Sequence, residues 1–506
     1  MAELNPIPRG LEPARKAAIV VAGLCVWAQG SALAQHVVTN ASLSTTVTAT
    51  HRSGSGGGAS DEVVGQISPG VTASVRSGTL EGSLNYSANV LLYANEGQNN
   101  RVSHSLASSA RYSLLSGRAG VDASASASEQ VISAFGVQGG GDTASRDNRA
   151  QTFSYSISPF LTGQLAGQTS YQVRFGYTGT RAGSTALGTS VSMNGSAGLS
   201  GRFGRASWGL NASEQVSESE GQARNRTGRA FASLGYAPDV ELQLTARYGR
   251  DFDNVRTGQS QMSATWGLGA QWVPGPRSSL SVDYDRRYFG DSYNVAFSHR
   301  MARTIWTYGT SRSVQTTPTV NRVDISAYEL FYVQFASIEP DPVKREQLVR
   351  GFLAARGIDP NGRVVIGGFL TSLASVQTQQ QLTAAYQGLR NTALVSFSSG
   401  SSRSIVQGAT GSDDLASGQA VRQRGLTVSL SHQLGHASSL VLTGSLQRTA
   451  ASGGRGGNEV RSLAGTWSAQ LTPRASASIG ARFTSFDSDV SPYNETAVFG
   501  TLGIRF

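Results

Sequence analysis

The sequence has almost no cysteine: Cys25 is the single one among 506 residues. Cys25 lies in an N-terminal segment that we expect to be removed, so the mature chain has no thiol for a disulfide or a thiolate metal site. The sequence also lacks any run of the ~18 uninterrupted apolar residues that a transmembrane helix requires. Lysine is nearly absent, and the positive charge of the chain therefore comes from arginine.

Charged residues are few and glycine is abundant. Charged residues make up 15% of the chain and hydrophobic residues 39%, and there are 60 glycines. This composition is typical either of many short strands joined by flexible loops or of a long disordered region. Apolar and polar residues alternate over many segments, and this period of two favours the strands.

The N-terminal residues have the pattern of a secretory signal peptide. Arg9, Arg15 and Lys16 form a basic stretch, residues 17–27 are apolar, and Ala32-Leu33-Ala34 is a cleavage motif. We therefore expect a signal peptide over residues 1–34, with cleavage near Ala34/Gln35. Leu24 stands before Cys25, where a lipoprotein signal requires a small residue, so we expect no lipid anchor.

The last strand-like segment of the chain ends in an aromatic residue. Its apolar face carries Leu502, Ile504 and Phe506, and Arg505 lies on the opposite face. A terminal aromatic that closes such a strand resembles the assembly signature of bacterial outer-membrane barrels. It predicts the outer membrane of a Gram-negative cell as the location, with the membrane lipid and the barrel assembly machinery as partners.

The same alternation recurs along the chain and predicts an all-β fold. Short turns, such as those near residues 77–78, 388–390 and 472–473, alternate with longer Gly-rich loops, such as 53–60 and 400–418. We expect one antiparallel transmembrane β-barrel over residues 35–506, with about 22 strands (20–24). An even number returns both chain ends to the periplasm. Pro69 and Pro159 fall inside expected strands and should mark bulges or strand ends.

The alternation lapses over residues 315–372, where we expect a partly helical insert. Asp341 to Gly357 has the capping pattern of a helix, with Pro342 at its first position. Leu348, Val349, Phe352 and Leu353 would form the apolar face of this helix. The insert leaves the outer rim of the barrel, and two placements stay open: a plug inside the lumen or an extracellular cap.

Several stretches resemble one family of outer-membrane barrels. They are 64–70 (VGQISPG), 84–87, 93–95, 155–160 (YSISPF) and, most specifically, 288–300 (YFGDSYNVAFSHR). Together they resemble the barrel family that accompanies PEP-CTERM/exosortase protein sorting and exopolysaccharide export in Gram-negative bacteria. The resemblance implies a role linked to that export. It carries over no catalytic residues, because the family has no established activity.

The candidates for catalysis are weak, and we expect no enzyme, no cofactor and no metal site. His299 is flanked by Ser298 but shares a face with Tyr293 and Phe297, which places it near the membrane interface. His432 and His436 flank a turn, which splays them apart. Asp283 and Asp285 alternate inward and more often indicate lumen polarity than an acid/base pair. A barrel hydrolase stays a minor alternative.

The expected lumen carries charges of both signs. The lumen-lining candidates are Arg174, Arg247, Arg300, Arg303, Arg482, Glu241, Asp283 and Asp285. Guanidinium groups in a water-filled pore favour anions and bind carboxylates and sugar hydroxyls. The alternative is ordinary lining in which arginines and carboxylates pair across the strands.

These observations predict a porin-like channel. Exopolysaccharide or anionic solutes are the expected cargo, on the strength of the resemblance and the arginines. The alternative is a non-conducting barrel that anchors surface polysaccharide or proteins, with its lumen blocked by the insert. The net charge of +10 does not indicate a nucleic-acid partner, because the arginines are spread singly over many strands of a secreted chain.

Overall fold

The fold is known from a computed structural model. It describes residues 36–54, 57–139, 148–165, 167–183, 188–316, 368–406, 413–416, 418–451, 456–489 and 491–506. Between 316 and 368 it describes 319–320, 323–326, 328, 331–332, 335, 345–346, 348–350, 353 and 363–366. The expected signal peptide and its cleavage site lie outside the described residues.

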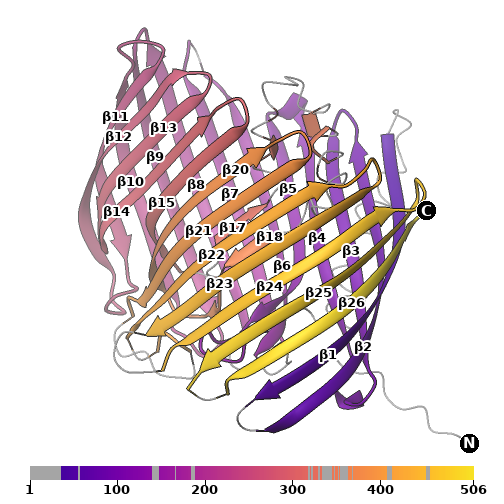
Figure 1. Cartoon of the computed structure of the whole chain (residues 1–506). Helices are drawn as coiled ribbons and strands as arrows, with labels where there is room; N and C mark the ends of the chain where they lie inside the picture. Colours follow the sequence, from indigo (N-terminus) through magenta and orange to yellow (C-terminus); the bar gives the residue numbers. More distant parts are fainter. Residues whose placement is uncertain are drawn as a thin grey trace, which may run out of the picture.

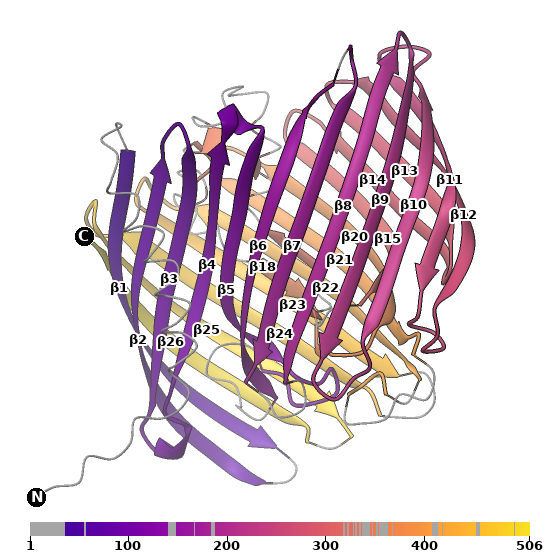
Figure 2. The same ribbon diagram turned by 180° about the vertical axis from the view of Figure 1, so that it is seen from behind.

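One closed sheet of 22 antiparallel strands forms the molecule (Figures 1 and 2). Each strand pairs with its neighbours in the chain, and β15 pairs with β20 across the insert. The strands are β1 His36–Gly54, β2 Gly57–Arg76, β3 Leu80–Tyr93, β4 Arg101–Leu114, β5 Ala119–Val131, β6 Arg149–Gln164, β7 Ser170–Ala182, β8 Thr189–Phe203, β9 Ala206–Ser219, β10 Asn225–Tyr236, β11 Leu242–Asp253, β12 Gln261–Gly275, β13 Ser278–Arg287, β14 Gly290–Arg300, β15 Thr304–Gln315, β20 Ser375–Gln387, β21 Asn391–Ser404, β22 Ala420–Gln433, β23 Ser438–Ala451, β24 Asn458–Gln470, β25 Ala475–Ser488 and β26 Tyr493–Arg505. The predicted barrel and its strand number are confirmed.

The barrel closes where β1 meets β26. Their register runs from Ser42↔Arg505 to Gly54↔Tyr493. The backbone N–H of Phe506 extends this ladder by donating to the Ala41 carbonyl at 2.9 Å. Over residues 42–54 β1 therefore has a neighbour on both sides, β2 and β26, which closes the sheet.

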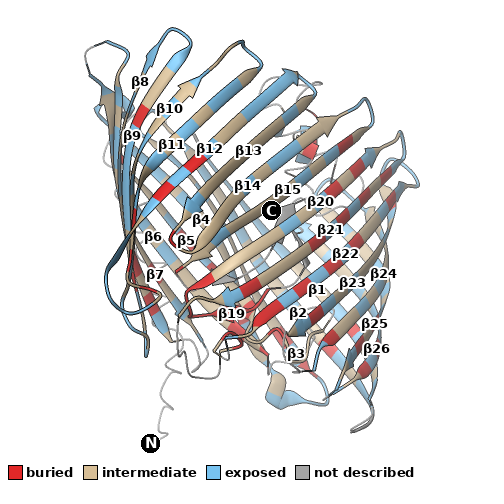
Figure 3. Cartoon of the chain, turned by 90° about the vertical axis from the view of Figure 1, so that its left-hand side faces the viewer, coloured by how far each residue is buried: buried red, intermediate tan, exposed pale blue. Residues whose placement is uncertain are grey.

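The two faces of the wall differ as the alternation predicts. Leu502, Ile504 and Phe506 lie exposed on the outer face, whereas Ala497 and Glu495 are buried on the inner one. Along β20, β21 and β22 buried and exposed positions alternate in the same way (Figure 3). An apolar outer face around a polar inner one is the arrangement of a transmembrane β-barrel. Among the described residues, no helix is long and apolar enough to cross a membrane.

The two ends of the barrel have different connections. The start of β1 and the end of β26 lie at one end, called here the termini end, which carries short turns such as those at residues 77–79 and 388–390. The opposite end, the loop end, carries the longer connections and both ends of the insert. Two expected loops are shorter than predicted, because β1 runs to Gly54, β2 begins at Gly57, and β21 runs to Ser404.

The prediction for the two prolines is wrong. Pro69 lies within β2 and pairs with Leu43, and Pro159 lies within β6 and pairs with Val121. The ladders to β3 and β7 lose two residue pairs at each proline but keep the same register on both sides. The missing N–H is therefore absorbed by a local gap in one ladder, without a bulge or a strand end.

The insert between β15 and β20 contains two short strand pairs and helical residues. β16 (Thr319–Val320) pairs with β19 (Leu370–Thr371), and β17 (Val323–Ser326) pairs with β18 (Arg363–Ile366). Residues 345–346, 348–350 and 353 of the expected helix are helical, and its caps and Phe352 lie outside the described residues. Leu348 does not belong to the apolar face as predicted: it is exposed, whereas Val349 and Leu353 are buried. Two single-turn 3-10 helices, Gly97–Asn99 and Leu115–Gly117, complete the elements.

Candidate functional site

Three groups of charged side chains on the lumen wall contain the predicted residues that form ion pairs. The first lies near the termini end on β4 to β7. Arg174 donates to the Asp122 carboxylate at 2.8 Å, and Arg111 donates to the same carboxylate at 2.6 Å. Both guanidinium groups lie over the ring of Phe160, 5.2 and 5.7 Å from its centroid. One carboxylate and one aromatic ring therefore hold two arginines against the inner wall.

The second group lies on β10 to β13. Asp285 accepts hydrogen bonds from Arg229 at 2.9 Å and from Arg247 at 3.2 Å. Arg247 also donates to Asp283 at 2.9 Å, and Arg229 lies 3.7 Å from Asp251. The side chains of Arg229, Arg247 and Asp285 are only 13–16% exposed. The group is a connected network in which each arginine contacts two carboxylates.

Glycines on β12 make room for this network. Gly267 and Gly269 pair with Asp285 and Asp283 on β13 and point into the lumen with them. A Cβ at Gly269 would lie 2.7 Å from Asp283 Oδ1, and one at Gly267 would collide with the Asp285 carboxylate. Side chains at these two positions would displace the carboxylates from the wall.

The third group lies beside the seam. Glu495 of β26 accepts from Arg482 at 2.9 Å and from Arg52 at 2.7 Å. The guanidinium group of Arg52 also lies over the ring of Tyr493, 4.7 Å from its centroid. Glu495 is buried, so its charge is compensated by two arginines from the strands on either side of it.

The predicted lumen residues thus divide into two sets. Arg174, Arg247, Arg482, Asp283 and Asp285 point inward and take part in ion pairs. Their partners Asp122, Arg229 and Glu495 were not among the predicted lumen residues. Each partner comes from another strand, and only the pairing register shows which residues meet. The sequence contained one hint, the Gly-x-Gly of β12 facing the Asp-x-Asp of β13.

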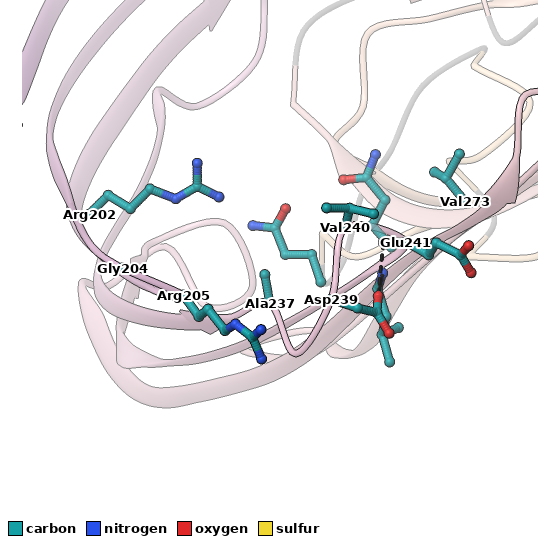
Figure 4. A pocket seen from close by; sticks show the side chains of 11 residues that line it. Arg202, Gly204, Arg205, Ala237, Asp239, Val240, Glu241 and Val273 are labelled. Carbon is teal, nitrogen blue, oxygen red and sulfur yellow. Dashed lines mark hydrogen bonds between the residues drawn. The ribbon is translucent and has the colours of Figure 1, made fainter.

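The other predicted residues lie at the termini end. Arg300 pairs with Ile305 and donates to the Pro276 carbonyl at 3.2 Å, and Arg303 lies in the turn between β14 and β15. Glu241 precedes β11 and lines a recess of about 440 Å³ together with Arg202 and Arg205 (Figure 4). In Figure 4 the Glu241 carboxylate and the Arg202 guanidinium lie on opposite sides of this recess.

The insert packs against the inner wall at the termini end. Ile305, Ala385 and Leu394 form one inward-facing rung across β15, β20 and β21. This rung is buried in one apolar cluster with Phe331, Phe335, Val349 and Leu353 of the insert. Because both ends of the insert attach at the loop end, these contacts mean that the segment runs down the inside of the barrel. Figures 1 and 2 both draw β18 within the barrel outline, and β18 contacts β22.

The connections at the loop end tie the base of the insert to other loops. The Asp413 carboxylate accepts from the Thr371 hydroxyl and from the Ser372 backbone N–H, both at 2.9 Å. The next residue, Asp414, accepts from the Ala134 backbone N–H at 2.7 Å. Two adjacent carboxylates therefore join the return of the insert to the connection between β5 and β6.

These loop-end contacts reach across the mouth of the barrel. Leu370 of the insert packs on Ala150 of β6, far from β15 and β20 around the sheet. The connection between β5 and β6 reaches the other side, where the Tyr493 hydroxyl donates to the Gln138 carbonyl at 2.6 Å. The mouth is thus bridged by chain from several sides.

Of the histidines weighed for catalysis, His299 and His432 have side-chain partners, and His432 Nδ1 lies 2.5 Å from the Asn391 Oδ1 atom. His299 lies on the outer face opposite Trp306, with Nδ1 2.8 Å from the Ser278 hydroxyl. Tyr288, in the turn after β13, is buried, and this burial raises the pKa of its phenol. No group of three or more His, Cys, Asp or Glu residues in the described part of the chain is arranged to hold a metal ion.

Comparison with known proteins finds structural likeness alone. No family model and no curated protein matches the sequence. The FrpB iron transporter of Neisseria meningitidis (F5-1 variant, apoprotein form) is 11% identical, with a TM-score of 0.46 over 92% of this chain and 81% of that chain. The siderophore receptor PirA of Acinetobacter baumannii is 8% identical, with a TM-score of 0.47 over 92% of this chain and 80% of that chain. OccAB1 of the same organism is 10% identical, with a TM-score of 0.34 over 92% of this chain and 97% of that chain. Values this low assign no activity to the chain.

Proposed function

We propose that the protein is a channel of the Gram-negative outer membrane that serves exopolysaccharide export alongside PEP-CTERM protein sorting. The terminal aromatic strand and the signal-like N-terminus support the location, and the resemblance of residues 288–300 supports the export link. The termini end would then face the periplasm and the loop end the outside. The signal-like N-terminus and the alternating strands are independent of the resemblance, so the location does not depend on the export assignment.

The observation that best supports a channel function is the charged inner wall of a closed barrel. A 22-stranded barrel is wide enough that a segment inside it is needed to restrict the lumen. Paired arginines and carboxylates, together with inward Phe160 and Phe231, offer hydrogen bonds and apolar faces to a hydroxyl-rich chain passing along the wall. The insert, packed on the rung at Ile305, is the plug of this channel.

A second candidate function is a non-conducting barrel that anchors polysaccharide or proteins at the surface. The bridged mouth favours it, because Asp413, Asp414 and Gln138 hold chain across the opening. In that case the insert is a permanent filling, and the loops are the working surface. The two candidates differ in whether the insert ever leaves the lumen.

Export is tested in the producing cell. The gene is deleted, and the strain is complemented either with the full chain or with a chain locked by an engineered disulfide between the insert and the wall. Channel function predicts polysaccharide retained in the periplasm of the deletion strain and of the locked strain, and released by the full chain. Normal surface polysaccharide in the deletion strain would reject the export role. Release by the locked strain would favour the anchoring role.

A further inference from the structure

Outward-facing arginines gather at the loop end of three neighbouring strands. They are exposed and share the outer face with the apolar residues Leu426 and Leu446. We call them the outer arginine cluster, which consists of Arg403 of β21, Arg422 and Arg424 of β22, and Arg448 of β23. These side chains point away from the lumen, so they take no part in the ion pairs of the inner wall.

The register places like charges directly opposite each other. Arg424 pairs with Arg448, one rung beyond the Leu426↔Leu446 pair. Arg422 lies two residues further along β22, and its partner on β21, Ser401, is two residues from Arg403. Like charges directly opposite each other destabilise an antiparallel sheet. An anion between the guanidinium groups would offset this repulsion.

The described part of the chain does not supply that anion. Among the described residues, no carboxylate forms an ion pair with any of the four arginines, and Glu459, opposite Arg448, accepts from Arg461 at 2.6 Å. Two outward arginines at the loop end of other strands are neutralised: Arg226 lies 2.5 Å from Glu214, and Arg286 lies 2.6 Å from Asp291. Arg181 and Arg250 also lie outward at the loop end without an ion pair to a described residue, but each stands alone, so the four arginines of the cluster are the local excess of positive charge on this surface.

The position of the cluster along the barrel axis indicates which kind of molecule carries the anion. Leu426 and Leu446 are the last apolar rung on the outer face of β22 and β23 before the loop end. The next rung lies roughly 7 Å further along each strand, which places Arg424 and Arg448 at the border between hydrocarbon and headgroups. Phosphates lie at that border, and the planar guanidinium group binds phosphate with two hydrogen bonds.

We propose that the outer arginine cluster binds the phosphate groups of lipid A, the phosphorylated glycolipid of the outer leaflet. The inference rests on the proposed outer-membrane location, with the loop end facing outside. Two phosphates on one sugar headgroup match a site in which the opposed pair Arg424–Arg448 is followed toward the loop end by the diagonal neighbours Arg422 and Arg403. Phosphatidylglycerol brings one phosphate, which is enough for one of these two pairs.

The test compares two double variants of the full mature chain in detergent. Arg424→Gln/Arg448→Gln removes the opposed pair, and Arg226→Gln/Arg286→Gln removes two outward arginines that are already neutralised. Bound lipid is counted by native mass spectrometry after addition of bisphosphorylated lipid A, the same lipid without phosphates, or phosphatidylglycerol. We expect the wild type and the Arg226/Arg286 variant to retain bisphosphorylated lipid A. The amount bound to the Arg424/Arg448 variant should be lower by roughly tenfold or more.

Stability without lipid separates lost binding from lost folding. In lipid-free detergent the Arg424/Arg448 variant should melt at the same temperature as the wild type or higher, because the like-charge contact is gone. Added lipid A should raise the melting temperature of the wild type more than that of this variant.

Three results would overturn the inference: equal retention by the Arg424/Arg448 variant, equal retention of the lipid without phosphates, or equal retention of phosphatidylglycerol. The assay involves no conduction, so a barrel that retains lipid A but passes no ions would reject the channel and leave the lipid site standing.

Discussion

Asp285 is a residue on which the balance of lumen charge depends. Its carboxylate joins Arg229 and Arg247, and its position is possible because Gly267 opposite it has no side chain. Arg229 and Arg247 are therefore not free positive charges. The preference for anions expected from the sequence should be weak in the native lumen.

Replacing Asp285 by Asn should change both stability and ion selectivity. The substitution keeps the shape of the side chain but leaves Arg229 and Arg247 without a shared counter-charge. Because these arginines are mostly shielded from solvent, we expect the barrel to lose about 1–3 kcal/mol of stability. In a barrel whose insert has been replaced by a short linker, the reversal potential should shift toward anion selectivity. The matched control is Asp487→Asn, an exposed carboxylate on the outer face of β25. An equal shift in the control would show that the network does not set selectivity.

Leu84 and Asn85 on β3 test which face is outside. Leu84→Arg puts a charge into lipid, which costs about 2–4 kcal/mol at the bilayer midplane and less toward the interface. Asn85→Arg, one residue along, points into the lumen and should fold normally. Folding is read from heat-modifiable gel mobility and urea titration. Equal stabilities would mean that the strand faces are assigned the wrong way round.

At the scale of elements, the strands could be predicted and the contacts between them could not. Strand number, the insert and the turns at residues 77–79 and 388–390 follow from a period of two interrupted by turn residues. The behaviour of Pro69 could not be predicted, because it depends on how the ladder to β3 tolerates a gap. The burial of Val349 depends likewise on a rung contributed by β15, β20 and β21, which are distant in the sequence.

Closure of the barrel depends on β26, whose last residue continues the ladder to β1. Deleting Phe506 removes the hydrogen bond to Ala41 and the terminal aromatic, and we expect a sharp fall in the amount of protein in the outer membrane. The deleted chain should collect as periplasmic aggregates or degradation products. Phe506→Tyr, which keeps an aromatic ring, is the control. Normal membrane yield for the deletion would contradict the assigned role of this residue.

The base of the insert should be released by a change at Asp413. Asp413→Ala removes the acceptor for Thr371 and for the Ser372 backbone, leaving polar groups at the mouth without that partner, at about 1–3 kcal/mol. Limited trypsin digestion of the folded barrel should then cut within the insert, at sites such as Arg345 or Arg350, several-fold faster than in the wild type. Asp487→Ala is the control, and unchanged protection in the Asp413 variant would mean that other contacts hold the insert.

At the scale of the whole molecule, the closed barrel and the insert inside it are separate structural units. The closed wall is complete without the insert, because β15 pairs directly with β20. The described residues of the insert reach inside the barrel to the rung at Ile305, and the residues where the insert returns to β20 are tied into the bridge across the mouth. The barrel strands can therefore stay paired if the insert moves, as a gated channel requires.

Single-channel conductance in planar bilayers tests this account most directly. The full chain is compared with a variant in which residues 317–370 are replaced by a short Gly/Ser linker, and with a control in which residues 452–455 are replaced in the same way. We expect a folded barrel in all three cases, low conductance for the full chain and the control, and a large steady conductance for the variant without the insert. A folded variant that conducts no more than the full chain would contradict it.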